Sequence, residues 1–206
     1  MTAEPMAAEA RRLEPPHPEA NRGLPIPLVG MLLFIASEVM FFGGLFAAYF
    51  NARANAAGHE WGPPAPAHEL EAWPLAAILT IILVTSSFTM QFGVWAIRRG
   101  DQRALRRWVG VTLLLGILFL GGQLYDYSQL GFGIGDGIFG TTFYTLTGFH
   151  GAHVFGGAVG LTILFARATS GQFSAKNHIA VEAISMYWHF VDVVWIALFS
   201  ILYFLR

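Results

Sequence analysis

Six ionisable side chains interrupt long stretches of otherwise apolar sequence, and carboxylates and imidazoles are the groups that most often hold or move protons in proteins. They are Glu38, His150, His153, Glu182, His189 and Asp192. An ionised side chain in the middle of a membrane costs about 3 kcal/mol or more. We therefore expect these groups to face other helices, to pair with one another, or to be protonated.

Five of these groups are expected at similar depths in a membrane. If the apolar stretches are helices that rise about 1.5 Å per residue, Glu38, His189 and Asp192 lie about 14–18 Å from the cytoplasmic ends of their segments. His150 and His153 reach the same depth on a helix that runs the other way through a core roughly 30 Å thick. Glu182 is expected on the same helix face as His189, but nearer the inner interface. The spacing predicts one mid-membrane cluster from three helices.

The chemistry of this cluster has three interpretations. The favoured one is a hydrogen-bonded network that clamps three helices together, with about 0.6–2 kcal/mol for each interhelical hydrogen bond. In the second, a carboxyl group in apolar surroundings exchanges a proton with a neighbouring imidazole. The least favoured is a metal site. The spacing of His150 and His153 is looser than the i, i+4 pair of zinc-binding helices, which weakens the metal interpretation.

The elements that must position these groups are five apolar segments, each near the length of about 20 residues that a helix needs to cross a membrane. Apolar residues make up 55% of the 206 residues and charged residues 12%, against about 25% charged residues in soluble proteins. We therefore predict an all-α membrane protein with five transmembrane helices, because a bilayer leaves an open chain no other way to satisfy its backbone. The segments are 27–50, 73–97, 108–127, 142–166 and 180–205.

Composition also excludes several classes of protein and site. The chain has no cysteine, which excludes disulfides, thiolate metal sites, iron–sulfur clusters and thioether haem attachment. Its formal net charge of −1 provides no basic field for nucleic acid. The apolar content excludes a disordered chain and a coiled coil.

The distribution of basic residues predicts the orientation of the bundle. Residues 1–24 mix charges of both signs with proline and alanine, which indicates a mobile tail ahead of a membrane domain over residues 25–206. Ten of the twelve basic residues fall in this tail and in the second and fourth loops, and only Arg53 and Arg206 fall on the other side. By the positive-inside rule, the N-terminus is cytoplasmic and the C-terminus is outside.

Small residues recur at every fourth position of the fourth segment. A stripe of this kind lies on one helix face and lets another helix approach closely. We predict a helix contact there, with chance in a glycine-rich chain as the alternative. The stripe consists of Gly148, Ala152, Gly156 and Gly160.

Several motifs carry a family resemblance. SEVMFFGGLFAAYF (37–50), TGFHGAHVFGG (147–157) and YWHFVDVVW (187–195) resemble the hallmark segments of subunit 3 of the haem–copper cytochrome c oxidases. GQLYDY (122–127) and Glu182 add to this resemblance, which covers nearly the whole chain after residue 25. YWHFVDVVW, in the last apolar segment, is the most specific of these motifs.

The resemblance implies a non-catalytic, cofactor-free subunit of an oxidase that passes electrons from cytochrome c to oxygen and pumps protons. Such a subunit stabilises subunit 1 and supports proton uptake, and Glu38 matches the family's carbodiimide-reactive membrane glutamate. The implied partners are subunits 1 and 2, a small fourth subunit, cytochrome c or a bc-type complex, and membrane phospholipid. Haem and copper are then expected in the partner subunits.

The sequence also departs from the larger family members. Those have seven helices, with a lipid-filled cleft between the first two and the last five, whereas this chain has only the last five. Five-helix forms occur in bacteria, which indicates a bacterial plasma membrane. The family often has glutamate where this sequence has Asp126.

Two alternatives stay open. One is a related subunit of a quinol oxidase or of nitric oxide reductase. The other is a stand-alone proton-coupled transporter, which is less favoured because the sequence shows no inverted repeat and no pair of proline-broken helices.

Overall fold

The structure is a computed structural model that describes residues 23–56, 61–63 and 72–205. Over these ranges it has five long helices and no strand, which confirms the predicted all-α class. Each helix is long and apolar enough to cross a membrane. The helices are α2 (Ile26–Asn55), α3 (Ala77–Arg98), α4 (Gln102–Gln129), α5 (Gly137–Thr169) and α6 (Ile179–Phe199). Two π-helical turns, η1 (Ala72–Ala76) and η2 (Ser200–Phe204), precede α3 and follow α6.

The helices extend beyond most of the predicted apolar segments. α4 begins at Gln102 rather than near residue 108, and α5 begins at Gly137 rather than near residue 142. Hydropathy marks only the part of a helix that suits hydrocarbon, whereas backbone hydrogen bonds continue through polar residues at its ends. Asp101 caps α4, because its side chain accepts a hydrogen bond of 2.9 Å from the Ala104 backbone N–H. The predicted tail, residues 1–24, lies almost wholly outside the described residues.

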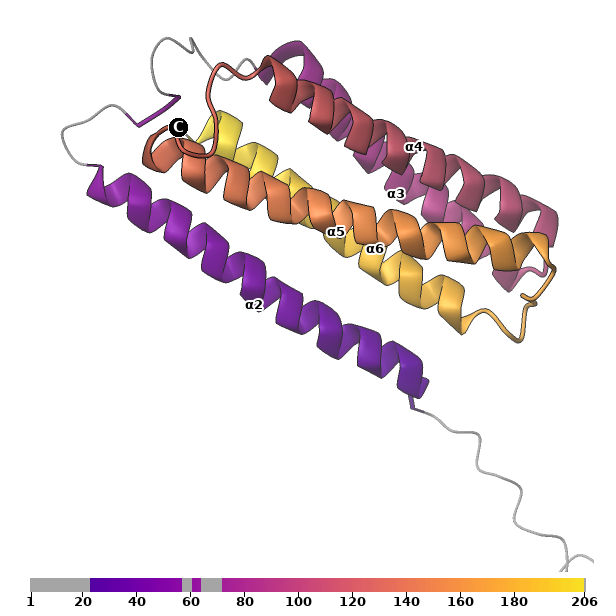
Figure 1. The fold of residues 1–206 in the computed structure, drawn as a ribbon. Helices are drawn as coiled ribbons and strands as arrows, with labels where there is room; N and C mark the ends of the chain where they lie inside the picture. Colours follow the sequence, from indigo (N-terminus) through magenta and orange to yellow (C-terminus); the bar gives the residue numbers. More distant parts are fainter. Residues whose placement is uncertain (1–22, 57–60, 64–71, 206) are drawn as a thin grey trace, which may run out of the picture.

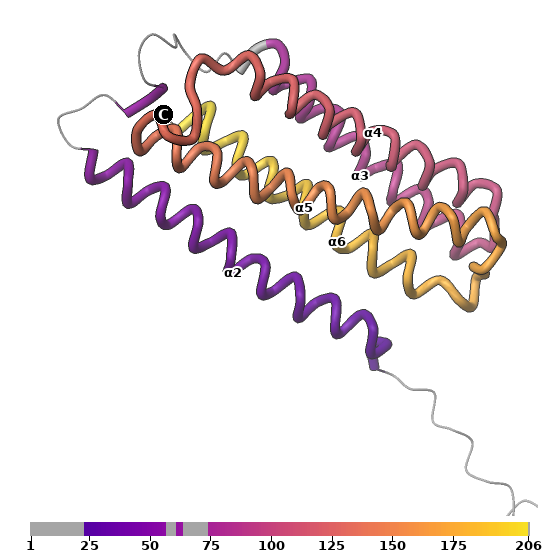
Figure 2. The backbone as a smooth tube through the Cα atoms, viewed as in Figure 1, coloured from indigo at the N-terminus to yellow at the C-terminus, as the bar shows by residue number. Residues whose placement is uncertain are grey.

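Four of the helices form a closed group, and the fifth packs on its edge (Figure 1). α3 contacts α4, α4 contacts α5, α5 contacts α6, and α6 returns to contact α3. Among the long helices, α2 makes its extensive contacts with α5 and α6. Figure 2 shows that the connections from α3 to α4 and from α5 to α6 lie at one end of the bundle, and that the connection from α4 to α5 lies at the other end. α2 is the least buried of the five helices and α6 is the most buried, so α2 keeps most of its apolar surface for lipid or another protein.

Trp188 of α6 lies at the centre of the four-helix group. Its side chain is fully buried, and its indole N–H donates to Ser86 Oγ of α3 at 2.8 Å. Gly116 of α4 and Gly157 of α5 face the same indole ring, since a β-carbon at either position would lie 2.7 or 2.8 Å from it. These two glycines allow α4 and α5 to approach α6 closely.

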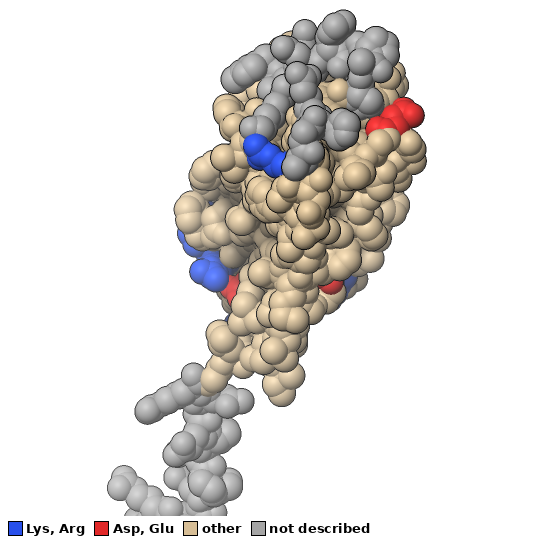
Figure 3. All heavy atoms as spheres, turned by 90° about the vertical axis from the view of Figure 1, so that its left-hand side faces the viewer, with Lys and Arg blue, Asp and Glu red and all other residues tan. Residues whose placement is uncertain are grey.

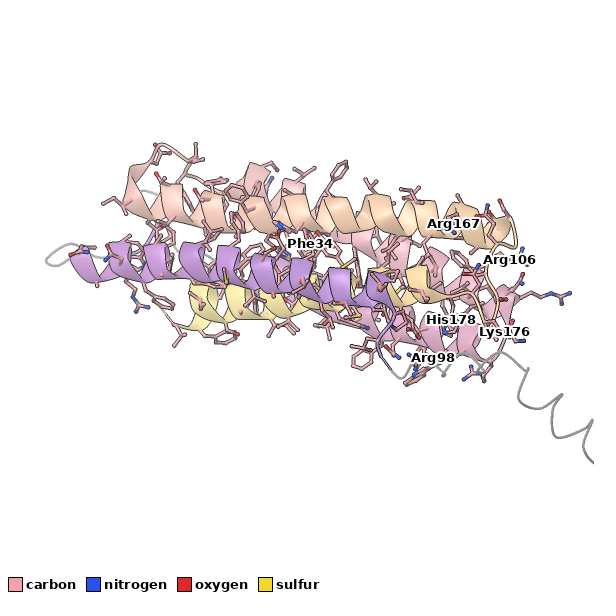
Figure 4. All side chains as sticks on the ribbon, turned by 90° about the horizontal axis from the view of Figure 1, so that it is seen from below. Phe34, Arg98, Arg106, Arg167, Lys176 and His178 are labelled. Atoms are coloured by element: carbon pink, nitrogen blue, oxygen red, sulfur yellow. The ribbon has the colours of Figure 1, made fainter. Side chains whose placement is uncertain are left out.

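Charged side chains gather at the ends of the bundle. Figure 3 shows that most of the described surface in that view is uncharged. The end predicted to be cytoplasmic carries five basic side chains that Figure 4 labels, namely Arg98, Arg106, Arg167, Lys176 and His178. At the opposite end, the Arg53 guanidinium donates to the Leu205 carbonyl and so joins α2 to the residue after η2.

Candidate functional site

Glu38 of α2 pairs with His153 of α5. Glu38 Oε2 lies 2.9 Å from His153 Nε2, and His153 Nδ1 lies 2.7 Å from the Phe149 carbonyl oxygen. Since a carbonyl can only accept, Nδ1 carries a proton and donates it. The proton between Nε2 and the carboxyl group then has two positions, which correspond to imidazolium with carboxylate or imidazole with carboxylic acid. The pair therefore holds one proton at either atom without losing its hydrogen bond.

Aromatic residues surround this pair at the junction of α2, α5 and α6. The Phe42 ring meets the His153 ring edge to face, with 4.9 Å between centroids, and the Phe41 ring lies 6.0 Å away. The Tyr187 hydroxyl of α6 donates to the His153 carbonyl at 3.0 Å. The side chains of Glu38 and His153 are 19% and 17% exposed, so the pair lies at the edge of the bundle rather than at its centre.

His189 and Asp192 of α6 meet at a residue that the sequence analysis missed. Ser87 of α3 lies with Oγ 2.8 Å from His189 Nδ1, and its hydroxyl donates to Asp192 Oδ2. Because a hydroxyl carries one proton, Ser87 accepts from Nδ1 while it donates to Asp192. This chain of hydrogen bonds joins α3 to α6. The sequence feature that could have indicated Ser87 is the pair of adjacent serines within TIILVTSSFTM (80–90), because hydroxyl groups in an apolar helix need hydrogen-bond partners.

Glu182 lies apart from both groups, at the basic end of the bundle. Its Oε1 accepts a 2.9 Å hydrogen bond from Arg98 Nε and lies 2.7 Å from Arg98 Nη2. His178 Nε2 lies 3.3 Å from the same oxygen. The contact joins the last turn of α3 to the first turn of α6. Arg98 is 54% exposed, and exposed ion pairs of this kind stabilise a protein by about 0–1 kcal/mol.

His150 lies in the aromatic core and not beside Glu38. Its side chain is fully buried, and its ring is stacked against Trp195 of α6 with 5.0 Å between centroids. Phe119 of α4 meets the same ring edge to face at 5.9 Å. Neither ring nitrogen has a hydrogen-bond partner within the described ranges.

The six predicted residues therefore occupy four places, and their hydrogen bonds do not join them into one network. Similar expected depths do not imply contact, because the rotation of each helix about its axis decides which neighbour a side chain meets. In the part of the chain that the structure describes, no three His, Asp or Glu residues are grouped closely enough to hold a metal ion.

The small-residue stripe of α5 makes no close helix approach at its start. Gly148, Ala152 and Gly156 are exposed, and a β-carbon at Gly148 would have nothing within 4 Å. The close approach inside this chain occurs at Gly157, because one residue turns a helix by about 100°. Towards its end the stripe faces α6 at ordinary contact distance, since a β-carbon would lie 3.6 Å from the Tyr187 hydroxyl at Gly156 and 3.8 Å from Ile184 at the partly buried Gly160. The close helix approach expected for the stripe as a whole stays a prediction.

Comparisons with known proteins agree with the motifs. The family described as Cytochrome c oxidase subunit III matches residues 9–206. The chain is 46% identical over 181 residues to the probable cytochrome c oxidase subunit 3 of Mycobacterium leprae, and 46% identical over 182 residues to the cytochrome c oxidase subunit 3 of Corynebacterium diphtheriae. It is 43% identical over 179 residues to the cytochrome c oxidase subunit 3 of Thermostichus vulcanus. Each alignment covers 86% of this chain and 87% of the relative.

The family match covers nearly the whole chain, including all five helices that are long and apolar enough to span a membrane. The Glu38–His153 pair also joins two of the segments that carry the family resemblance. By these criteria the chain belongs to the cytochrome c oxidase subunit III family.

Proposed function

We propose that this chain is the non-catalytic third subunit of an aerobic terminal oxidase that transfers electrons from cytochrome c to oxygen and pumps protons. The observation that carries the proposal is the family match over residues 9–206, with relatives named cytochrome c oxidase subunit 3 aligned along 87% of their length. Electron transfer and oxygen reduction then take place in the partner subunits 1 and 2, which hold the haem and copper. A small fourth subunit and a bc-type complex are further partners.

The role proposed for the chain within that complex is to stabilise subunit 1 and to support proton uptake. The Glu38–His153 pair suits proton handling, because its shared proton can lie on either residue within one 2.9 Å hydrogen bond. The exposed apolar surface of α2 suits contact with lipid or another membrane subunit. Phospholipid is proposed as a bound component of the complex.

The proposed location is a bacterial plasma membrane, with the N-terminus in the cytoplasm and the C-terminus outside. Support comes from the basic end of the bundle, where the ends of α3 and α5 meet the starts of α4 and α6. The positive-inside rule places such an end on the cytoplasmic side.

Purification through an affinity tag on this chain tests the proposal. In mild detergent, we expect haem absorbance and two larger subunits to co-purify, and the preparation should oxidise reduced cytochrome c with oxygen as acceptor. An untagged strain provides the control for non-specific binding. Purification of the chain alone, without haem, would contradict the oxidase role and favour a stand-alone transporter. Oxidation of quinol but not of cytochrome c would select the quinol-oxidase alternative.

A further inference from the structure

One face of α4 changes from basic to apolar along its length. Arg103, Arg106 and Arg107 are followed on the same face by Gly110, Val111 and Leu114, since positions three, four, seven and eight residues apart lie together on a helix. Figure 4 places Arg106 at the basic end of the bundle. This face therefore runs from the membrane interface towards the hydrocarbon.

The surface along this face has two adjoining shallow depressions that are open to the outside. A hollow of about 560 Å³ is lined by Arg103, Arg106 and Arg107. A groove of about 400 Å³ continues from Arg106 and Arg107 between α4 and α5, with Phe165 of α5 among its lining residues. The Phe165 ring packs closely against Gly110 here, because a β-carbon at position 110 would lie only 3.1 Å from that ring. We call the two hollows together the α4–α5 groove.

The guanidinium groups at the mouth of the groove are not neutralised within the described residues, where no carboxylate forms a salt bridge with Arg103, Arg106 or Arg107. Arg106 Nε and Arg107 Nε donate to carbonyls one turn earlier, at 3.4 and 3.5 Å, which leaves their terminal nitrogens available. The neighbouring carboxylate, Asp101, is committed to capping α4. The hydrogen bond from the Ala104 N–H, with smaller contributions from charges such as Arg107, lowers the pKa of Asp101.

We propose that the α4–α5 groove binds one anionic phospholipid. Its phosphate group lies among Arg103, Arg106 and Arg107, and one acyl chain follows the groove past Val111 and Leu114. The distance along the helix axis from Arg107 to Leu114 is about 10 Å, in the direction in which a lipid in the same leaflet enters the membrane. Three arginines that form no salt bridge within the described residues favour an anionic headgroup over a zwitterionic one, and the apolar groove favours a lipid over a free phosphate ion.

Lipid binding to the purified complex, measured by native mass spectrometry, tests this site. The complex is depleted of lipid and then titrated with phosphatidylglycerol or with phosphatidylcholine. We expect one phosphatidylglycerol to bind wild-type complex at least tenfold more tightly than phosphatidylcholine, and the double variant Arg106→Gln with Arg107→Gln to lose this preference. The matched control, Arg99→Gln with Lys176→Gln, removes two exposed charges from the same end outside the groove and should retain it.

A second variant separates a lipid site from a patch that binds only phosphate. Val111→Trp fills the apolar groove without changing the charge and should also abolish the preferred site, whereas binding of inorganic phosphate should not change. Val111 and Leu114 are exposed, so Leu114→Trp serves the same purpose if the first variant fails to assemble.

Three results would overturn the proposal. They are unchanged phosphatidylglycerol binding in the arginine variant, equal loss in the matched control, and retention of the site after the groove is filled. The inference does not depend on the oxidase role, because the same titration applies to the full chain if it purifies alone.

Discussion

Glu38 Oε2 of α2 lies 2.9 Å from His153 Nε2 of α5, and the Phe149 carbonyl fixes the proton on the other ring nitrogen of His153. The pair connects the least buried helix to the rest of the bundle. It also leaves a single proton to be shared between a carboxyl group and an imidazole. The same contact therefore serves two of the interpretations made from the sequence, a helix clamp and a proton site.

Replacement of Glu38 by glutamine separates these two roles. The amide can donate to His153 Nε2, so the α2–α5 contact is retained while the shared proton is lost. If the carboxyl group handles protons, Glu38→Gln should lower the number of protons pumped per oxygen molecule or shorten the catalytic lifetime of the complex. Oxygen reduction should stay largely intact in the first turnovers.

Asp136→Asn is a suitable control for the loss of a carboxylate. Asp136 accepts a hydrogen bond from the Gly133 N–H at the opposite end of the bundle, and asparagine retains an acceptor there. Unchanged proton stoichiometry and unchanged lifetime in Glu38→Gln would reduce the pair to a structural contact.

Removal of Ser87 should weaken the contact between α3 and α6. In Ser87→Ala, both His189 Nδ1 and Asp192 Oδ2 lose their hydrogen-bond partner in the described structure, which costs about 1–3 kcal/mol for a buried polar group. His189→Ala should likewise reduce retention of the chain in the complex during detergent challenge. Ser37→Ala is the matched control, since among the described residues the Ser37 hydroxyl bonds only to the Phe34 carbonyl of its own helix. Equal detergent stability of Ser87→Ala and Ser37→Ala would rule out this clamp.

Glycine replacements distinguish the real close approach on α5 from the stripe predicted there. A β-carbon at Gly157 meets the buried Trp188 ring at 2.8 Å, whereas one at Gly148 meets nothing within 4 Å. Overpacking of this kind costs about 1–3 kcal/mol, so Gly157→Ala should lower the thermal stability of the chain and Gly148→Ala should not. The measurement is the unfolding temperature in detergent. A loss in the assembled complex with Gly148→Ala, and none in the isolated chain, would instead locate a partner helix on the stripe.

The cap at Asp101 should depend on pH. Its pKa is lowered from 3.8 in the folded chain, first of all by the Ala104 hydrogen bond. The cap therefore stabilises the start of α4 at pH values above about 4, and this contribution is lost as the pH falls through the folded pKa. Hydrogen exchange of the first turn of α4, corrected for the intrinsic rate, should lose protection on acidification below about pH 4. In Asp101→Asn the amide oxygen accepts at every pH, so a pH-dependent loss of the same size in that variant would contradict the prediction.

The packing around Trp188 could not be predicted from the sequence. YWHFVDVVW was recognised as a family motif, but the sequence offered no way to see that Trp188 bonds to Ser86 of α3 and packs on Gly116 and Gly157. Likewise, the positions of Glu38 and His153 in the apolar segments predict similar depths for the two residues. Their direct contact was not, because it depends on which helices are neighbours and how each is rotated.

The amino-acid sequence by itself determined the five membrane-spanning helices and the family, because hydropathy over about 20 residues and local motifs are properties of contiguous segments. Only the tertiary structure decided that His153, and not His150, faces Glu38, and that Ser87 joins His189 to Asp192. The reason is that side-chain contacts between helices depend on axial rotation and neighbour order, which arise from the packing of the whole bundle around residues such as Trp188.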